Sequence, residues 1–165
     1  MMWLVLSLAF AADGDEVGGF VMGQTAELDG LECRESSCQK RGEVAGTLGT
    51  WAVKHCSGVV TGATFSVTYV PNTEAAQAHF QAYGQHVADP ESDAHVRQQA
   101  WIDALVSAGW QIHTEHQDDD GSEWVRVVKA PHARLVRVRH RAVNGLDTFT
   151  TSLTASATDP SCPRP

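Results

Sequence analysis

The clearest pattern of apolar and polar positions lies in residues 110–154, where the two kinds alternate with the period of two that is typical of β-strands. The dipeptide Asn144-Gly145 interrupts this pattern and favours a two-residue hairpin turn, because such a turn needs a positive φ angle at both positions. Turns at 117–121 and 130–133 predict two more hairpins. The segment therefore predicts a four-stranded antiparallel meander.

The turns also set the register in which the predicted strands pair. The Asn144-Gly145 turn pairs Val138 with Thr151, and the loop before it pairs Val127 with Val136. A slip of one residue would move every side chain to the other face. The three turns, taken independently, nevertheless place one set of apolar residues on a single face: Ile112, Val125, Val127, Val136, Val138, Phe149 and Leu153. Other elements must cover this face.

Residues 72–108 change from the period of two to a helical period. Spacings of four and three residues form one apolar stripe, which consists of Ala76, Phe80, Tyr83 and Val87. Asp89-Pro90 is typical of a helix cap followed by a first-turn proline, and Gly109 is typical of a helix end. Two helices so close in sequence predict a helical hairpin, which is available to cover the meander.

The segment 43–70 completes the predicted fold. It is rich in Val, Thr and aromatic residues with glycine interruptions, a composition that predicts two or three strands. The expected fold class is therefore α+β, a helical hairpin packed on a four-stranded antiparallel meander with additional N-terminal strands. The length suits one domain. We place it at residues 20–158, after an acidic and glycine-rich linker at 13–19 and before a proline-rich tail at 159–165.

The first twelve residues are apolar and carry small residues at Ala9 and Ala11, the spacing that signal peptidase recognises. We therefore interpret residues 1–12 as a signal peptide and expect a periplasmic or secreted protein. The alternative is a buried N-terminal strand, because no Lys or Arg precedes the apolar run. A transmembrane helix needs about 20 apolar residues, so the run predicts no membrane span.

The chain contains four cysteines, an even number that favours two disulfides in an exported protein. A short turn separates Cys33 from Cys38, which favours that pair and leaves Cys56 to pair with Cys162. A zinc site is the competing interpretation. It is disfavoured because the sequence has no Cys-x-x-Cys pair and its fourth cysteine lies in the proline-rich tail.

The chain has 20 acidic and 12 basic residues and a net charge of −8, which argues against nucleic acid or an anionic membrane as partner. The polar face of the predicted meander nevertheless collects cationic and aromatic residues: His113, Glu115, Trp124, Arg126, Arg137, Arg139 and Arg141. Guanidinium groups bind carboxylates and stack on aromatic rings. We interpret this face as a binding surface for an acidic protein or an envelope component. The alternative is a solvated face that only maintains solubility.

Motifs for catalysis and cofactor binding are absent from the sequence, including the nucleophile elbow, the zinc-protease helix, the phosphate loop and the dinucleotide fingerprint. His113 and His116 lie on opposite faces of a strand and cannot easily share a metal ion. The carboxylates of residues 118–123 suit calcium, although Asp120-Gly121 is more typical of a hairpin turn. We therefore expect no catalytic residue, cofactor or metal.

The leading hypothesis is an exported, small, disulfide-bonded domain that acts as a non-enzymatic binding or interaction module. Two alternatives remain, a small extracytoplasmic hydrolase and a purely structural envelope protein. An aromatic anchor surrounded by arginines would favour the first hypothesis. A deep pocket with converging histidines and carboxylates would favour the hydrolase.

The export hypothesis predicts the N-terminus of the mature protein. Because the small residues at Ala9 and Ala11 suit signal peptidase, N-terminal sequencing of the protein from its native host should begin at Ala12 or Asp13. Recovery of chains that still begin at Met1, in a cytoplasmic fraction, would contradict the hypothesis.

Overall fold

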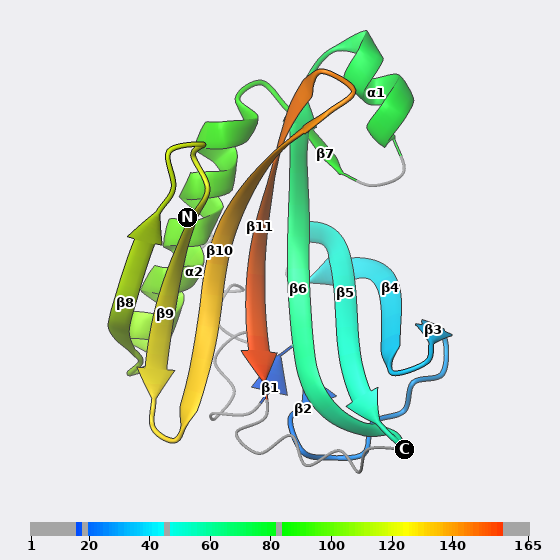
Figure 1. The fold of residues 1–165 in the computed structure, drawn as a ribbon, viewed down its shortest axis with the longest axis vertical. Helices are drawn as coiled ribbons and strands as arrows, with labels where there is room; N and C mark the ends of the chain where they lie inside the picture. The colour runs from blue at the N-terminus through cyan, green and yellow to red at the C-terminus, as the bar shows by residue number, and fades with distance from the viewer. Residues whose placement is uncertain (1–15, 18–19, 45–46, 82–83, 157–165) are drawn as a thin grey trace, which may run out of the picture.

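The computed structural model describes residues 16–17, 20–44, 47–81 and 84–156. Within these residues the chain forms one nine-stranded sheet, a separate two-stranded hairpin and two helices (Figure 1). The hairpin consists of β1 (Glu16–Val17) and β2 (Phe20–Val21). The predicted signal peptide (1–12), most of the predicted linker (13–19) and the predicted tail (159–165) lie outside the described residues.

Eight of the nine strands follow one another as antiparallel neighbours in the order β3-β4-β5-β6-β11-β10-β9-β8, and the ninth, the short β7, pairs parallel with the end of β6. The strand bounds are β3 (Glu32–Arg34), β4 (Ser37–Val44), β5 (Thr47–Cys56), β6 (Val59–Pro71), β7 (Gln85–Val87), β8 (Gln111–Gln117), β9 (Glu123–Lys129), β10 (His132–Val143) and β11 (Leu146–Ser156).

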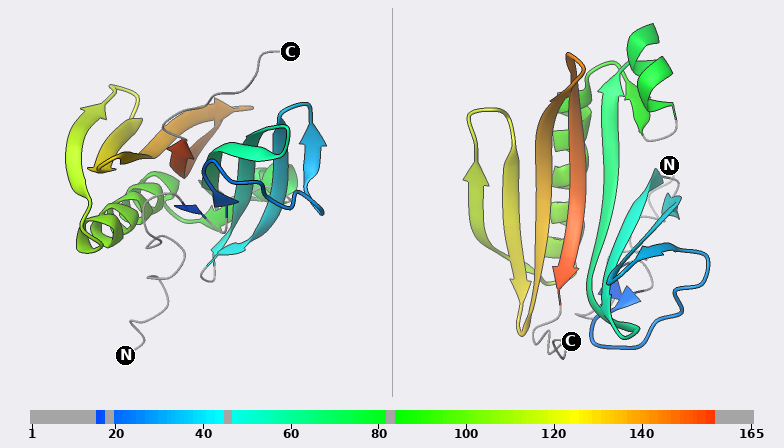
Figure 2. Two further views of the ribbon diagram at one scale, coloured as in Figure 1. Left: turned by 90° about the horizontal axis from the view of Figure 1, so that it is seen from below. Right: turned by 45° about the vertical axis from the view of Figure 1, so that its right-hand side comes forward.

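The two helices differ in length and position. Helix α1 (Glu74–Phe80) is capped by the hydroxyl of Thr73, which accepts a hydrogen bond from the backbone of Ala76. Helix α2 (Pro90–Ser107) starts as expected, because the carboxylate of Asp89 accepts a hydrogen bond from the backbone of Ser92 and proline occupies the first turn. Figure 2 shows α2 lying along one face of the curved sheet and α1 at the end of β6. Within the described residues, neither helix combines the length and hydropathy that crossing a membrane requires.

The predicted arrangement, a helical hairpin on a four-stranded meander, is wrong. Strand β7 separates the two helices, and Val87, expected on the apolar stripe of a helix, pairs with Pro71 instead. The sheet also does not end with the meander, because β6 pairs along β11 and joins the N-terminal strands to it. This pairing connects segments that lie far apart in the sequence, so no turn signal announces it.

The inner face of the sheet, defined here as the face that packs on α2, carries the hydrophobic core. Trp101 and Leu105 of α2 are buried on it, and the ring of Trp101 lies 5.9 Å from that of Phe65 on β6. The β1–β2 hairpin adds Val17, from the predicted linker, and Phe20 to the same core. Each large apolar side chain buried in this way contributes about 1.5–3 kcal/mol. Together they hold α2 on the sheet.

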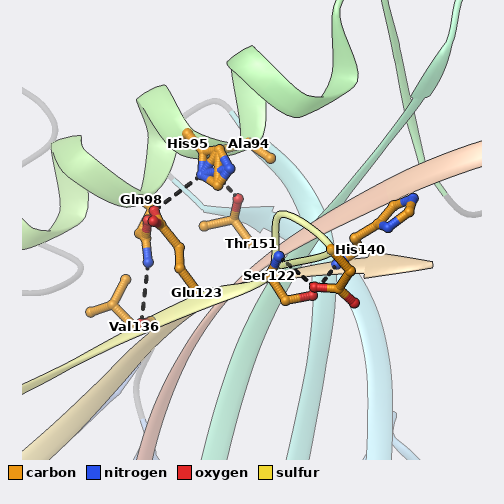
Figure 3. Close-up of polar contacts among 9 residues, drawn as sticks. Ala94, His95, Gln98, Ser122, Glu123, Val136, His140 and Thr151 are labelled. Atoms are coloured by element: carbon orange, nitrogen blue, oxygen red, sulfur yellow. Dashed lines mark hydrogen bonds and ion pairs between the residues drawn. The ribbon is translucent and has the colours of Figure 1, made fainter. Parts of the chain in front are cut away.

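Buried hydrogen bonds fix the position of α2 on the inner face (Figure 3). The hydroxyl of Thr151 donates to the carbonyl of Ala94 at 2.7 Å, and the amide of Gln98 donates to the carbonyl of Val136 at 3.5 Å. Thr151 and Gln98 are both buried, so losing either partner would leave a polar group without compensation. The helix therefore has one preferred position along the strands.

The register of the meander was predicted in part. The predicted pair Val138–Thr151 is confirmed, and the same register places Val143 opposite Leu146. On the other side of β10, Val136 lies opposite Val125 rather than the expected Val127, because the loop contains two residues instead of four. A shift of two residues keeps each side chain on its face. The predicted apolar set is therefore buried, except for Ile112.

Strand β8 departs from the predicted register at a bulge between Ile112 and Thr114. Ile112 lies opposite Val127 as expected, but beyond the bulge Thr114 lies opposite Arg126. Glu115 lies opposite Val125, a residue of the inner face. The extra residue of the bulge reverses the alternation of inner and outer side chains along β8. Even-numbered residues point to the inner face before the bulge, and odd-numbered residues do so after it.

The cysteines are bonded in the region that the structure describes. Cys33 and Cys38 lie directly opposite each other on β3 and β4, and their sulfur atoms are joined at 2.04 Å, which confirms the predicted pair. Cys56 is also disulfide-bonded. Its predicted partner, Cys162, lies outside the described residues, so that pairing stays a prediction.

Two substitutions to aspartate test the assignment of the sheet faces. Val138 is fully buried on the inner face, so Val138→Asp should destabilise the fold by about 4 kcal/mol or more, because the carboxylate would lack a partner. Thr150 lies on the other face opposite Arg139, so Thr150→Asp should change the stability by about 1 kcal/mol or less. Thermal melts of both variants provide the measurement. The reverse ordering would show that the two faces are exchanged.

Candidate functional site

The outer face of the sheet, opposite α2, carries a concentration of arginines. On strands β6, β9, β10 and β11 the side chains that point to this outer face include no Asp or Glu. They include four exposed arginines of the predicted site: Arg126, Arg137, Arg139 and Arg141. Hydroxyl residues of β6 and β11 fill much of the rest of this face, and Thr68 contacts Thr150 at 3.0 Å. The acidic chain therefore keeps one cationic, hydroxyl-rich surface.

A cleft of about 430 Å³ opens where β10 continues past Glu123, the first residue of the antiparallel strand β9. The pairing of these strands ends at Val138 and Glu123, whereas β10 extends to Val143. One side of the cleft comes from β10, and the other comes from the start of β9 and the turn before it. The lining residues are Asp118, Asp120, Ser122, Glu123, Trp124, Arg137, Val138, Arg139, His140 and Arg141.

The cleft brings together four of the seven residues of the predicted binding surface: Trp124, Arg137, Arg139 and Arg141. Trp124 lies directly opposite Arg137 across the β9–β10 pair. The Trp124 ring is half-buried and lies 5.6 Å from that of His116, at an angle of 32°. Trp124 is thus held as a partly exposed ring beside a row of guanidinium groups.

The other three predicted residues lie elsewhere. Arg126 is on the outer face opposite Leu135, outside the cleft. The β8 bulge places Glu115 in a separate hollow of about 440 Å³ that also involves Ile102 of α2. His113 lies at the bulge, and its Nδ1 atom is 2.8 Å from the hydroxyl of Thr114. The single surface predicted from the sequence is therefore divided by the bulge.

Each carboxylate that lines the cleft already has a partner. Asp118 pairs with His116 at 2.8 Å, and Glu123 pairs with His95 of α2 at 3.1 Å. Asp120 accepts a hydrogen bond from the backbone N–H of Ser122 at 2.8 Å. That bond and a second one from the Ser122 hydroxyl hold the pKa of the Asp120 carboxyl below its usual value.

The arginines of the cleft have no such partners. Among the described residues, no carboxylate lies within ion-pair distance of Arg137, Arg139 or Arg141. All three are exposed on one strand. A guanidinium group presents a planar fork of donors that matches a carboxylate. The cleft is therefore suited to receive carboxylate groups from outside the chain.

His140 and the turn residues belong to the cleft although sequence reasoning did not select them. As expected, His140 lies opposite Phe149 on the inner side, and their rings stack at 4.7 Å. Its imidazole pairs with Asp147 at 2.9 Å, and its backbone N–H donates to the hydroxyl of Ser122 at 3.0 Å. The turn before β9 was predicted, but nothing in the sequence indicated that it would lie beside β10.

One further cluster has the residue types of a metal site. The ligand atoms of Cys33, Cys38 and His55 lie within 4.8 Å of one another. The two sulfur atoms are joined to each other, so neither is present as the thiolate that a metal ion requires. This cluster is a disulfide with a neighbouring histidine.

Comparison with protein-family models, curated proteins and solved structures finds no match for this chain. The function must therefore be argued from the cleft itself.

The hydrogen bonds of Asp120 generate a testable pH effect. Ser122→Ala removes the hydroxyl and keeps the backbone N–H, so the pKa of Asp120 should rise toward its usual value. A carboxylate with a lowered pKa stabilises the fold above its unfolded-state pKa, and this contribution is lost as the pH falls through the folded-state pKa. The variant should therefore lose this contribution at a higher pH. An NMR titration of the Asp120 carboxyl carbon measures the shift.

Ser152→Ala serves as the control for this titration, because Ser152 is on β11 opposite Arg137 and does not line the cleft. It should leave the pKa of Asp120 unchanged. An equal pKa in wild type and Ser122→Ala would contradict the hydroxyl contact.

Proposed function

We propose that this chain is an exported, non-enzymatic binding module that receives a carboxylate-bearing partner, an acidic protein or another acidic envelope component, in the cleft beside β10. The observation that carries the proposal is the contrast between the two kinds of charge in the cleft. Asp118, Asp120 and Glu123 have partners within the chain. Arg137 and Arg139 have none among the described residues.

The fold provides a reason for this contrast. Arginines that only maintained solubility could alternate with carboxylates on the sheet face. Cross-strand pairs of opposite charge would then add stability to the sheet. Instead, Arg139 and Arg141 lie opposite Thr150 and Thr148. The half-buried Trp124 adds an aromatic surface next to them, and Trp with Arg is the combination most often found at energetically important points of interfaces.

The geometry gives less support to the alternative of a hydrolase. The cleft contains serine, histidine and aspartate, but the Ser122 hydroxyl accepts a hydrogen bond from the backbone of His140. The imidazole of His140 is paired with Asp147 and stacked on Phe149. In a Ser-His-Asp triad the serine hydroxyl must donate to the imidazole, which acts as its base. These residues have structural contacts instead.

The disulfides support the proposed location. The bridge between Cys33 and Cys38, together with the bonded Cys56, suits an oxidising compartment such as the periplasm or the exterior of the cell. In such a compartment an acidic partner would meet the arginines of the cleft without competition from intracellular nucleic acids.

A double substitution tests the proposed site. Arg137→Ser with Arg139→Ser should weaken binding of fluorescently labelled poly-L-glutamate about tenfold at low salt, because two charge-assisted contacts are lost. The loss should shrink as ionic strength rises, since exposed charges are screened. Fluorescence anisotropy gives the affinity. The melting temperature should stay within about 3 °C, because surface changes of this kind seldom exceed about 0.5 kcal/mol.

The matched control is Arg41→Ser with Arg126→Ser. It removes the same charge from the outer face, at exposed positions outside the cleft. This control should retain most of the affinity. Equal losses in both double variants would show that binding depends on net charge alone and would contradict the proposed cleft.

A further inference from the structure

Within the described residues, strand β10 has a backbone edge with no strand beside it, and this edge begins in the cleft and continues past it. It pairs with β11 from Arg134 to Val143, but its pairing with β9 stops at Val138. Among the strands that the structure describes, the part of β10 beyond that point therefore has a neighbour on one side only. This segment carries Arg139 and Arg141, and Ala142 follows them as an exposed residue.

The direction of the free backbone groups follows from two contacts. The N–H of His140 donates to Ser122, on the β9 side, and the carbonyl of Arg141 accepts from the Thr148 hydroxyl, on the β11 side. Backbone groups of successive residues in a strand point to opposite sides. The N–H and C=O of Ala142 and the C=O of His140 therefore point to the free edge. Unpaired groups of this kind are a template for another strand.

We infer that the cleft binds its partner by strand addition, so that an extended acidic polypeptide pairs with the β10 edge at residues 139–143. The inference rests on the proposed function and adds the class of partner, a polypeptide, and its backbone conformation. Main-chain hydrogen bonds to Ala142 and His140 would supply affinity, as in other cases of β-strand addition. The added strand would occupy the position that β9 leaves vacant.

The arginines determine which side chains the partner carries. Arg139 and Arg141 point to the outer face about 7 Å apart, which is the spacing of alternate residues in any strand. Side chains that lie opposite each other in a strand pair share a face. Alternate residues of the partner therefore meet the two guanidinium groups, and these should be Glu or Asp.

The residues between them meet a different environment. On the inner side the cleft presents His140, and Asp120 of the turn is close enough to His140 to interact with it electrostatically. A carboxylate at these positions of the partner would be repelled. The favoured sequence therefore alternates acidic residues with neutral ones. Charge complementarity on one face thus identifies the partner as a patterned peptide rather than a uniform polyanion.

Modified peptides test the backbone pairing on the wild-type protein. The probe is an acetylated eight-residue peptide that alternates Glu and Thr. One derivative carries N-methyl groups on every Thr nitrogen and the other on every Glu nitrogen. With the Glu side chains on the face of the arginines, only one set of peptide N–H groups can point to β10. These are the Thr N–H groups if the peptide runs antiparallel to β10, and the Glu N–H groups if it runs parallel. Methylation of that set should therefore weaken binding at least about tenfold, whereas the other derivative should bind like the probe.

A substitution on the protein tests the same edge. Ala142→Pro removes the N–H that faces the free edge of β10, and Ala142→Ser keeps it. Binding of the probe should fall at least about tenfold in the proline variant and stay near wild type in the serine variant. Both should bind poly-L-glutamate like wild type, which separates this inference from the proposed function. Isothermal titration gives the affinities, and thermal melts check the fold.

The outcomes are distinguishable. Loss confined to one methylated peptide supports strand addition and gives its orientation, even if the proline variant fails to fold. Equal binding of both methylated peptides, or equal loss in both, would overturn strand addition while leaving the arginine result for poly-L-glutamate intact. Wild-type protein that binds neither the probe nor poly-L-glutamate would overturn the proposed function as well.

Discussion

The pairing of β6 with β11 is the interaction on which the rest of this structure depends. It runs from Tyr69–Phe149 to Gly62–Ser156 and joins the N-terminal strands to the C-terminal meander. The resulting sheet has one continuous inner face, on which Phe65 of β6 and Leu153 of β11 lie directly opposite each other. Helix α2 packs on this face and is fixed there by the contact between Thr151 and Ala94. The core therefore requires both halves of the chain.

The candidate site is a consequence of unequal strand lengths within this sheet. Strands β10 and β11 form a long hairpin, whereas β9 starts only at Glu123. The turn before β9 is drawn toward α2, because Glu123 pairs with His95 and Gly121 lies beside Glu91. That displacement leaves the end of β10 without a neighbour on one side. The cleft, its free arginines and its open backbone edge all result from it.

Charge acts differently on the two sides of the cleft. The carboxylates of Asp118, Glu123 and Asp120 contact His116, His95 and Ser122, so they are oriented within the chain and stabilise local structure. The arginines project from a strand whose position is already fixed by the core, and the sheet does not need their charge. Such groups are available for a partner at little cost in stability. This division supports a binding role for a chain whose net charge of −8 would by itself repel an acidic partner.

Features with local causes could be predicted from the amino-acid sequence. The Asn144-Gly145 turn set the β10–β11 register, Asp89-Pro90 set the start of α2, and alternation placed Val136 on the inner face. It also placed Trp124 beside the arginines of β10. The pairing of β6 with β11 and the position of β7 between the helices could not be predicted in this way, because contacts between distant segments leave no periodic pattern in either segment. The β8 bulge, which removed Glu115 from the predicted surface, was likewise decided by packing, since a single extra residue in a strand has no sequence signature of its own.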